Sequence, residues 1–394
     1  MWKAYSAFVI RLFIFALLLF SSIATFCRTI RSSRHTSVSI VRIPSDWIAP
    51  DAIMDENGVL HMVFAKDGNA YYVQSKSDGA KWSHPVQINT VSNVEYRMGE
   101  RGPKMAIGAD GVIHVVWEDY WSPGVKTYVR YARSLNGGGS FEKEQTLSSM
   151  SGVDGVSVAS DKQGNVWVFW HVLDPPQSDA PDATWLWMAH SSDNGKTFGV
   201  NQRMTASNRS LLACSMCMTY PMINGYGDLF LAYRSAVHSI RDIYVLKSVK
   251  PWTTFTALRV NHDNWLLDQC PMCGPSLTLT PAGNPLCAFM SKNRVYWSVY
   301  DHRRQAFHLH VQTPDNQDGE RYPFAIQNRL GQILFTWQVG PMSTNGNSTV
   351  KWALYLADGT YEGSKGTIGI GNSGTKPTAF IGKNNEFYII TSAK

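Results

Sequence analysis

Residues 101–118, RGPKMAIGADGVIHVVWE, predict a β-hairpin. Residues 104–108 and 112–117 are two short, mostly apolar runs, and Ala109, Asp110 and Gly111 lie between them. Asp-Gly between two apolar runs is a strong hairpin signal, because glycine accepts the positive φ that such turns need. The segment therefore predicts two antiparallel strands joined by a tight turn.

The same pattern occurs seven times along the chain. The copies begin at residues 47, 101, 153, 218, 273, 321 and 375, and the turn glycines of the first six lie 53, 53, 63, 56 and 48 residues apart. Between the hairpins, alternating runs suit third strands at 127–133, 184–190, 242–247 and 350–356. A strand-turn-strand repeat with this period is typical of a β-propeller with four strands per blade. The predicted fold class is therefore all-β.

A second repeat follows the predicted third strands. Residues 191–198, SSDNGKTF, match the pattern S-x-D-x-G-x-T-F in full, and degraded copies stand at 75–82, 134–141 and 248–255. In such a turn the aspartate accepts hydrogen bonds from backbone amides, and the glycine adopts the left-handed conformation. We interpret this repeat as architectural and assign no chemistry to it.

These turns resemble the BNR repeats, or Asp boxes, of the sialidase superfamily, and the resemblance covers roughly residues 47–394. It implies a β-propeller over residues 36–394, with four-stranded blades and with the Asp boxes on the outer rim. Sialidase propellers have six blades. Here a seventh hairpin, from residue 375, could pair with a strand at 36–43 to close the ring. That closure favours seven blades, with six as the alternative.

Residues 1–34 form a segment of their own. They carry five basic residues, no acidic residue and an apolar run at 12–26. A run of this length suits a cleaved signal peptide or an uncleaved membrane anchor, so we expect an exported protein. Subtracting these five charges from the net charge of +6 leaves +1 for residues 35–394. That balance argues against nucleic acid as a partner, because nucleic-acid binding needs basic residues gathered on the domain itself.

The repeat register predicts which side chains gather around the centre of the ring. In a propeller blade, the start of the first strand and the end of the second lie on one rim, and the hairpin turn lies on the other. Ionic side chains are rarely buried without a partner, so we expect the polar residues at these positions to surround a central mouth. Those positions hold Ile48, Arg101, Asp154, Cys273, Arg321 and Thr375 before the first strands, and Ala65, Glu118, His171, Arg234, Met290, Gln338 and Ser392 after the second strands.

The resemblance implies roles for several of these residues. In sialidases three arginines clamp the substrate carboxylate, an aspartate acts as acid/base, and a tyrosine–glutamate pair supplies the nucleophile. A guanidinium fork suits a carboxylate because it can bind bidentately. The implied substrate-binding residues are Arg101, Arg234 and Arg321, with His171 beside them. The implied catalytic residues are Glu118 and Asp154 for acid/base work and Tyr322, or alternatively Tyr120, as nucleophile.

The cysteines depart from the sialidase pattern. Four of six form two C-x-x-C pairs, Cys214/Cys217 and Cys270/Cys273, and each pair precedes the first strand of a blade. Four thiolates can enclose one tetrahedral metal ion, and nearby methionines favour Cu(I), although Zn is the commoner occupant. In an oxidising compartment the same pairs could form disulfides or act as redox thiols. All three interpretations stay open at this stage.

Two functions follow from these patterns. The first is an exported sialidase-like propeller that binds an anionic glycan or glycoconjugate at the central rim, with its hydrolysis as a further step. The second is a non-catalytic propeller with a cysteine-ligated Zn or Cu ion, or with a partner-binding site. On a third interpretation the arginines, Glu118 and Asp154 form a salt-bridged ring that only plugs the channel. The N-terminal segment is the one expected membrane contact, and the sequence does not predict an oligomeric state.

Overall fold

The computed structural model describes residues 36–96, 100–172, 182–315, 317–340, 348–370 and 377–392. The chain divides into two units, Met1–Ser37 and Val38–Lys394, and the account below concerns the second. The predicted signal peptide or membrane anchor, residues 1–34, lies outside the described residues. Within the described part of the chain, no helix has both the length and the apolar character that a membrane crossing requires.

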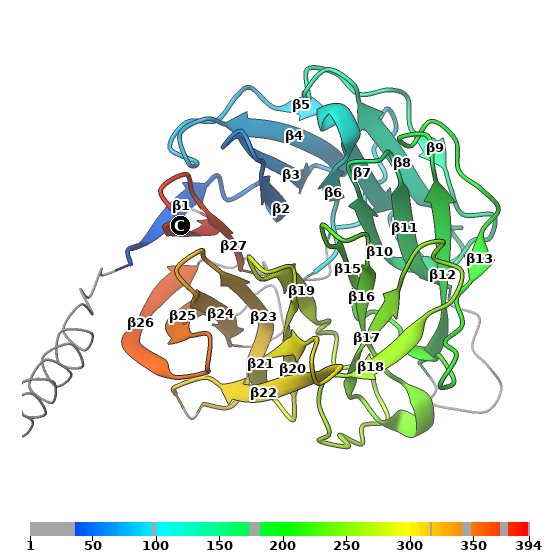
Figure 1. Ribbon diagram of the computed structural model, residues 1–394. Helices are drawn as coiled ribbons and strands as arrows, with labels where there is room; N and C mark the ends of the chain where they lie inside the picture. The colour runs from blue at the N-terminus through cyan, green and yellow to red at the C-terminus, as the bar shows by residue number, and fades with distance from the viewer. Residues whose placement is uncertain are drawn as a thin grey trace, which may run out of the picture. The chain divides into compact units, whose positions relative to one another are not determined.

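Six antiparallel sheets, five with four strands and one with five, follow one another along the chain and surround a common centre (Figure 1). Blade one consists of β2 (Ile48–Met54), β3 (Leu60–Lys66), β4 (Asn69–Ser75) and β5 (Val86–Gln87), and blade two of β6 (Lys104–Ile107), β7 (Ile113–Glu118), β8 (Val129–Ser134) and β9 (Gln145–Thr146). Blade three consists of β10 (Val153–Ser160), β11 (Val166–Val172), β12 (Ala183–Ser191) and β13 (Gln202–Arg203), and β14 (Ala213–Cys214) also pairs with β12. Blade four consists of β15 (Tyr220–Ile223), β16 (Leu229–Arg234), β17 (Ile243–Ser248) and β18 (Thr256–Arg259), and blade five of β19 (Ser276–Leu279), β20 (Pro285–Ser291), β21 (Arg294–Asp301) and β22 (Ala306–Gln312). Blade six consists of β23 (Glu320–Gln327), β24 (Gln332–Val339), β25 (Ser348–Leu356) and β26 (Tyr361–Ile370). Two short 3₁₀ turns, η1 (Ala109–Gly111) and η2 (Val237–Ser239), complete the described elements.

The seventh blade joins the two ends of the propeller. Its strands are β27 (Thr378–Ile381), β28 (Phe387–Ser392) and β1 (Val38–Ile43), in the order β1-β28-β27. β1 pairs with β28 in parallel, from Val38 opposite Phe387 to Ile43 opposite Ser392. The predicted all-β propeller, its seven blades and its closure by the first strand are therefore confirmed, and the six-bladed alternative is wrong.

Strand register places the predicted rim residues together. Asp154 is opposite His171 across β10 and β11, and Arg321 is opposite Gln338 across β23 and β24. We call the rim where first strands begin and second strands end the strand-start rim, and the opposite one, which carries the hairpin turns, the turn rim. The two sides of these two repeats therefore meet on one rim, as predicted, while Thr375 of the seventh repeat lies outside the described residues.

A bulge follows several strand-start positions. The pairing shifts between Ile48 and Asp51, between Asp154 and Ser157, and between Arg321 and Phe324. The residue just after the rim position is left-handed in each of these three blades: Ala49 (φ 51), Gly155 (φ 68) and Tyr322 (φ 50). A bulge bends its strand and redirects a side chain. It thus sets the direction of the side chains on this rim.

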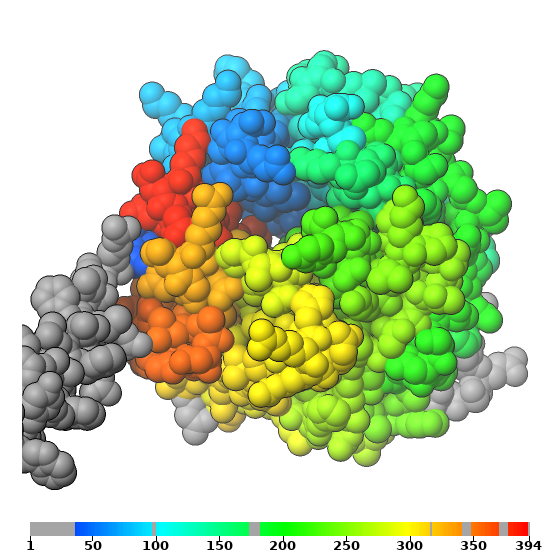
Figure 2. Space-filling view, viewed as in Figure 1, coloured from blue at the N-terminus to red at the C-terminus, as the bar shows by residue number. Residues whose placement is uncertain are grey.

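Hydrophobic cores lie between neighbouring blades. One cluster joins Val63 and Tyr72 of blade one to Met105 and Val115 of blade two, and equivalent clusters join the later blades. In the space-filling view the blades pack side by side around the ring (Figure 2). Alternation along the strands buries one face of each blade against the next, which is why seven weakly similar hairpins form one body.

A tight contact on the turn rim joins blades two and three. Tyr131 Oη lies 2.8 Å from His114 Nδ1, and the Tyr131 ring packs edge-on against Phe198 with 4.9 Å between centroids. Gly195 covers Tyr131 so closely that a Cβ on it would stand 1.7 Å from Oη, and its φ is 75°. The S-x-D-x-G-x-T-F turn therefore contributes its glycine and its aromatic residue to the interface with the preceding blade.

The same contact joins blades one and two. Tyr72 Oη lies 2.7 Å from His61 Nδ1, and Phe141 packs edge-on against the Tyr72 ring at 5.7 Å. A Cβ on Gly138 would lie 2.0 Å from that ring. In both interfaces, a histidine on the second strand contacts a tyrosine on the third strand of one blade. The tyrosine ring then packs so closely against the turn of the next blade that only glycine fits there.

We predict that Gly195→Ala lowers the free energy of unfolding by about 2–5 kcal/mol, because the alanine meets Tyr131 and also strains a left-handed backbone. Gly227→Ala is the matched control, since Gly227 has φ 84° but open space around a Cβ. It should lose only about 1–2 kcal/mol. Denaturant titrations of both variants measure the difference. Equal losses would contradict the packing role of Gly195.

Candidate functional site

Arg101 lies between two buried carboxylates on the strand-start rim. Its Nε is 2.9 Å from Glu118 Oε1 and 2.9 Å from Asp154 Oδ1, and its Nη2 is 2.6 Å from Asp154 Oδ2. All three side chains are buried. Glu118 ends β7 and Asp154 lies at the start of β10, so the guanidinium joins blades two and three.

This network contains one cation and two acids, and that imbalance raises the pKa of Glu118. Burial is the main cause, the nearby charge of Asp154 adds to it and Arg101 opposes it, and the result is a pKa of about 8. At neutral pH the Glu118 carboxyl therefore retains a proton, which reduces the charge buried in the network.

Arg234 is occupied by backbone carbonyls. Its Nε and Nη2 donate to Cys273 O at 3.1 and 2.8 Å, Nη2 also donates to Met290 O at 2.9 Å, and Nη1 donates to Arg241 O at 2.6 Å. The Trp265 ring covers the guanidinium at 5.4 Å. Because Nε, Nη1 and Nη2 of Arg234 all donate to backbone carbonyls, these donors are not available to a substrate carboxylate.

His171 is also satisfied within the protein. It is fully buried, with Nδ1 3.0 Å from Thr184 Oγ1 and Nε2 3.0 Å from Cys217 O. Burial lowers its pKa below the usual value. A neutral histidine with both nitrogens engaged supports the neighbouring cysteine loop.

Arg321 differs from the other two rim arginines. Among the residues that the structure describes, its Nε and Nη1 have no hydrogen-bond partner, although both atoms are buried. Gln338, directly opposite on β24, donates from Nε2 to Ser348 Oγ at 2.5 Å, while its Oε1 has no partner either. As far as the described ranges go, two donors and one acceptor therefore stand unpaired on adjacent strands at this rim.

Tyr322, the predicted nucleophile, lies beside Arg321 in a buried position. Its backbone N–H donates to Cys273 Sγ at 3.2 Å, and burial raises the pKa of its phenol. The structure thus brings Tyr322 next to Cys273, and it brings Glu118 and Asp154 to Arg101. The alternative nucleophile, Tyr120, is partly exposed just beyond β7.

A residue without a predicted role, Glu100, crosses the centre of the ring. Its Oε2 accepts a hydrogen bond of 2.6 Å from Gly274 N–H, which belongs to the segment before blade five. Blades two and five are not neighbours in a ring of seven, so this bond spans the channel at the strand-start rim. The only sequence signal for it is its position directly before Arg101.

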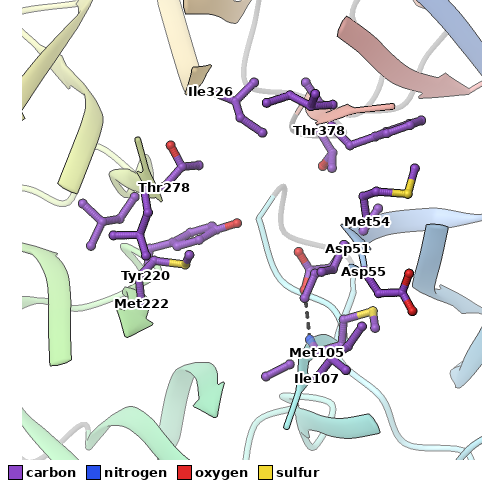
Figure 3. Close-up of a pocket in the computed structure, with 18 of the residues that line it drawn as sticks. Asp51, Met54, Asp55, Met105, Ile107, Tyr220, Met222, Thr278, Ile326 and Thr378 are labelled. Carbon is purple, nitrogen blue, oxygen red and sulfur yellow. Dashed lines mark hydrogen bonds between the residues drawn. The ribbon is translucent and has the colours of Figure 1, made fainter. Parts of the chain in front are cut away.

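Below Glu100 the innermost strands of all seven blades enclose a cavity of about 880 Å³ (Figure 3). Figure 3 shows the Tyr220 and Asp51 side chains facing this space, and Asp51 Oδ2 accepts a hydrogen bond of 2.9 Å from Met105 N–H. Its lining reaches the turn rim at exposed Lys162 and Lys383. Arg101, Arg234 and Arg321 do not line it. We place the candidate site at the strand-start rim, because polar groups converge there while the cavity wall is largely apolar.

Three of the four predicted metal ligands come together. The Sγ atoms of Cys214, Cys217 and Cys270 are 3.2–3.5 Å apart. Cys273 Sγ lies outside this group and accepts the Tyr322 N–H instead. Cys287 is buried mid-strand in β20.

Comparisons with known proteins support the propeller fold. No family model and no curated protein matches the chain. A solved structure of α-L-arabinanase from Penicillium chrysogenum in complex with arabinobiose matches with 12% identity and a TM-score of 0.53, over 82% of this chain and 99% of that one. A PL25 ulvan lyase bound to a GlcA–Rha3S saccharide matches with 10% identity and a TM-score of 0.52, over 85% and 84%. A Dyadobacter fermentans protein of unknown function matches with 17% identity and a TM-score of 0.51, over 77% and 94%. At these identities the likeness shows the propeller fold alone.

We predict that Arg101→Met lowers the free energy of unfolding by about 3–5 kcal/mol, because the buried Asp154 carboxylate loses its cation and the Glu118 carboxyl loses its hydrogen-bond donor. Arg321→Met is the matched control, since Arg321 stands at the same register without an ion pair in the described structure. It should change stability by less than about 1 kcal/mol. Thermal or denaturant unfolding separates the two, and similar losses would contradict the structural role of Arg101.

We predict a second effect for Glu118→Gln. Between the carboxyl's unfolded value of 4.5 and its folded value of about 8, the folded protein holds a proton that the unfolded chain has lost. The free energy of unfolding of the wild type relative to Glu118→Gln should therefore fall as pH rises from 5 to 8, by at most about 1.4 kcal/mol per pH unit. Urea titrations across this range measure the slope. A flat or rising difference would show that Glu118 is ionised in the fold.

Proposed function

We propose that the chain is an exported glycan-binding propeller whose ligand docks at Arg321 and Gln338 on the strand-start rim. The observation that carries this proposal is the set of unpaired polar atoms there, Arg321 Nε and Nη1 and Gln338 Oε1. An unsatisfied buried polar group costs about 1–3 kcal/mol. Since all three atoms are buried, a ligand must displace the groups that cover them before it can supply the missing partners and regain that free energy.

The chemistry of these atoms suits an anionic sugar. A carboxylate or sulfate accepts from two guanidinium N–H groups, and a sugar hydroxyl can donate to Gln338 Oε1 while it accepts from Arg321. The arabinanase and the ulvan lyase were solved with saccharides, and this supports a glycan as the ligand class. Trp121, 54% exposed just after β7, adds an aromatic face on the same rim.

Binding, and not hydrolysis by Glu118 and Asp154, is the activity that the geometry favours. A general acid or base must reach the proton that it transfers. Both carboxylates instead contact the same Arg101 Nε at 2.9 Å, within a buried network. A glycosidic oxygen could reach either of them only if Arg101 moved away.

We predict that purified full-length protein binds sialylated or uronate-containing oligosaccharides in calorimetric titrations. Arg321→Met should weaken binding at least tenfold, about 1.4 kcal/mol. Gln338→Leu should weaken it as well. The control is Arg304→Met, since Arg304 is exposed on the turn between β21 and β22. Arg321→Met binding as tightly as the wild type would contradict the proposal, as would a lack of binding across neutral and acidic glycans.

A fluorogenic sialoside tests the chemical step separately. We expect no turnover by the wild type. Turnover that Glu118→Gln or Asp154→Asn abolishes would show that the Arg101 network opens and that the protein is a hydrolase.

A further inference from the structure

Three cysteine sulfurs form a compact triangle between blades three, four and five. Cys214 ends β14, Cys217 follows three residues later, and Cys270 belongs to the segment before β19. Their Sγ atoms are 3.2 Å (Cys214–Cys270), 3.3 Å (Cys214–Cys217) and 3.5 Å (Cys217–Cys270) apart. Cys214 and Cys217 are fully buried, and Cys270 is partly buried.

The two loops hold these sulfurs in similar ways. The third residue of each C-x-x-C segment is left-handed, Met216 at φ 56° and Met272 at φ 45°, so each loop turns sharply. Met272 N–H donates to Cys270 Sγ at 3.3 Å, and the Cys270 thiol donates to Ser215 O at 2.7 Å. The triangle is therefore fixed by backbone contacts from both loops.

The nearly equal separations favour one shared atom over one disulfide. A disulfide would join two of the sulfurs by a bond of about 2.05 Å and leave the third sulfur unbonded. An ion about 2.3 Å from each sulfur would instead sit about 1.3 Å above the plane of the triangle as it stands. A planar three-sulfur site with bonds of this length needs the sulfurs about 4.0 Å apart, so the triangle must widen by about 0.5–0.8 Å when it takes up a single small ion.

Positive charge accompanies the sulfurs. Arg241 has no exposed side-chain surface, lies within electrostatic range of Cys214 and Cys270, and donates from Nη2 to Asp182 Oδ1 at 2.6 Å. Its buried Nη1 has no hydrogen-bond partner in the described part of the chain. Nε and Nη2 are satisfied by Leu267 O and Asp182, so Nη1 is the donor left over, and an anionic thiolate cluster nearby compensates for its burial better than neutral thiols do.

We propose that Cys214, Cys217 and Cys270 bind one Cu(I) ion through three thiolates. Soft thiolates select Cu(I) or Zn(II), and structural zinc is almost always held by four ligands. Among the described residues three sulfurs meet, and the fourth cysteine of the two pairs, Cys273, is engaged by Tyr322 N–H. The site is separate from Arg321 and Gln338 and does not depend on glycan binding.

Cu(I) titration of the reduced, full-length protein against a chromogenic Cu(I) chelator tests this site. We expect one Cu(I) per chain and X-ray absorption that fits three sulfurs. Cys214→Ser, Cys217→Ser and Cys270→Ser should each weaken Cu(I) binding at least 100-fold. Cys273→Ser, from the same C-x-x-C pair, and Cys287→Ser are matched controls that should bind as the wild type does. The wild-type stoichiometry and sulfur count stand even if a variant fails to fold.

Three results would overturn the proposal. The first is an absence of Cu(I) binding by the reduced wild type. The second is tight Zn(II) binding that requires Cys273 and fits four sulfurs, which would identify a four-cysteine zinc cage. The third is a thiol count that shows Cys214, Cys217 or Cys270 in a disulfide that reductant does not open, which would identify a structural crosslink.

Discussion

The pairing of β1 with β28 is the contact on which the rest of the molecule depends. It brings Val38–Ile43 beside Phe387–Ser392 and so joins the two ends of the propeller into one blade. Val41 and Ile43 also pack among the core residues of blades one and seven. β1 has the direction of a fourth strand, because it leads into the first strand of blade one. It therefore meets β28, a second strand, in parallel. With the ring closed, seven strand starts face one centre, and only then do residues far apart in the sequence form a site.

The arginines on that rim have different roles, which depend on the hydrogen-bond acceptors that the next blade places beside them. Arg101 meets Asp154 of the following blade and becomes an ion-paired link, and Arg234 meets the carbonyls of Cys273 and Met290 and becomes another. Glu100 links blades two and five across the centre. For Arg321, no described residue of the next blade accepts a hydrogen bond from Nε or Nη1. The sequence presents a salt-bridged plug and a binding site as alternatives. In the proposed arrangement both occur on one rim, because Arg101, Arg234 and Glu100 link the blades while Arg321 serves the ligand.

The sequence predicts the fold and the membership of this rim because both follow from the register of a repeat. Turn glycines and apolar alternation locate every blade, and the strand-start positions follow by counting. The hydrogen-bond partner of each rim residue cannot be predicted from the repeat register. Whether Arg321 is paired depends on the bulge after it and on Gln338 across the sheet, and both are tertiary features. The C-x-x-C spacing likewise treats four cysteines as equals, whereas in the fold Cys273 Sγ accepts the Tyr322 N–H and only Cys270 of that pair joins the sulfur cluster.

An experimental structure of the protein with a sialylated or uronate-containing oligosaccharide tests the central claim most directly. The account predicts the ligand's anionic group within hydrogen-bonding distance of the Arg321 guanidinium and a sugar hydroxyl on Gln338 Oε1. It also predicts that Arg101 still contacts Glu118 and Asp154, and that Arg234 keeps its carbonyls. A ligand held between Arg101 and Arg234 with those contacts broken, or one bound in the cavity at the turn rim, would contradict it.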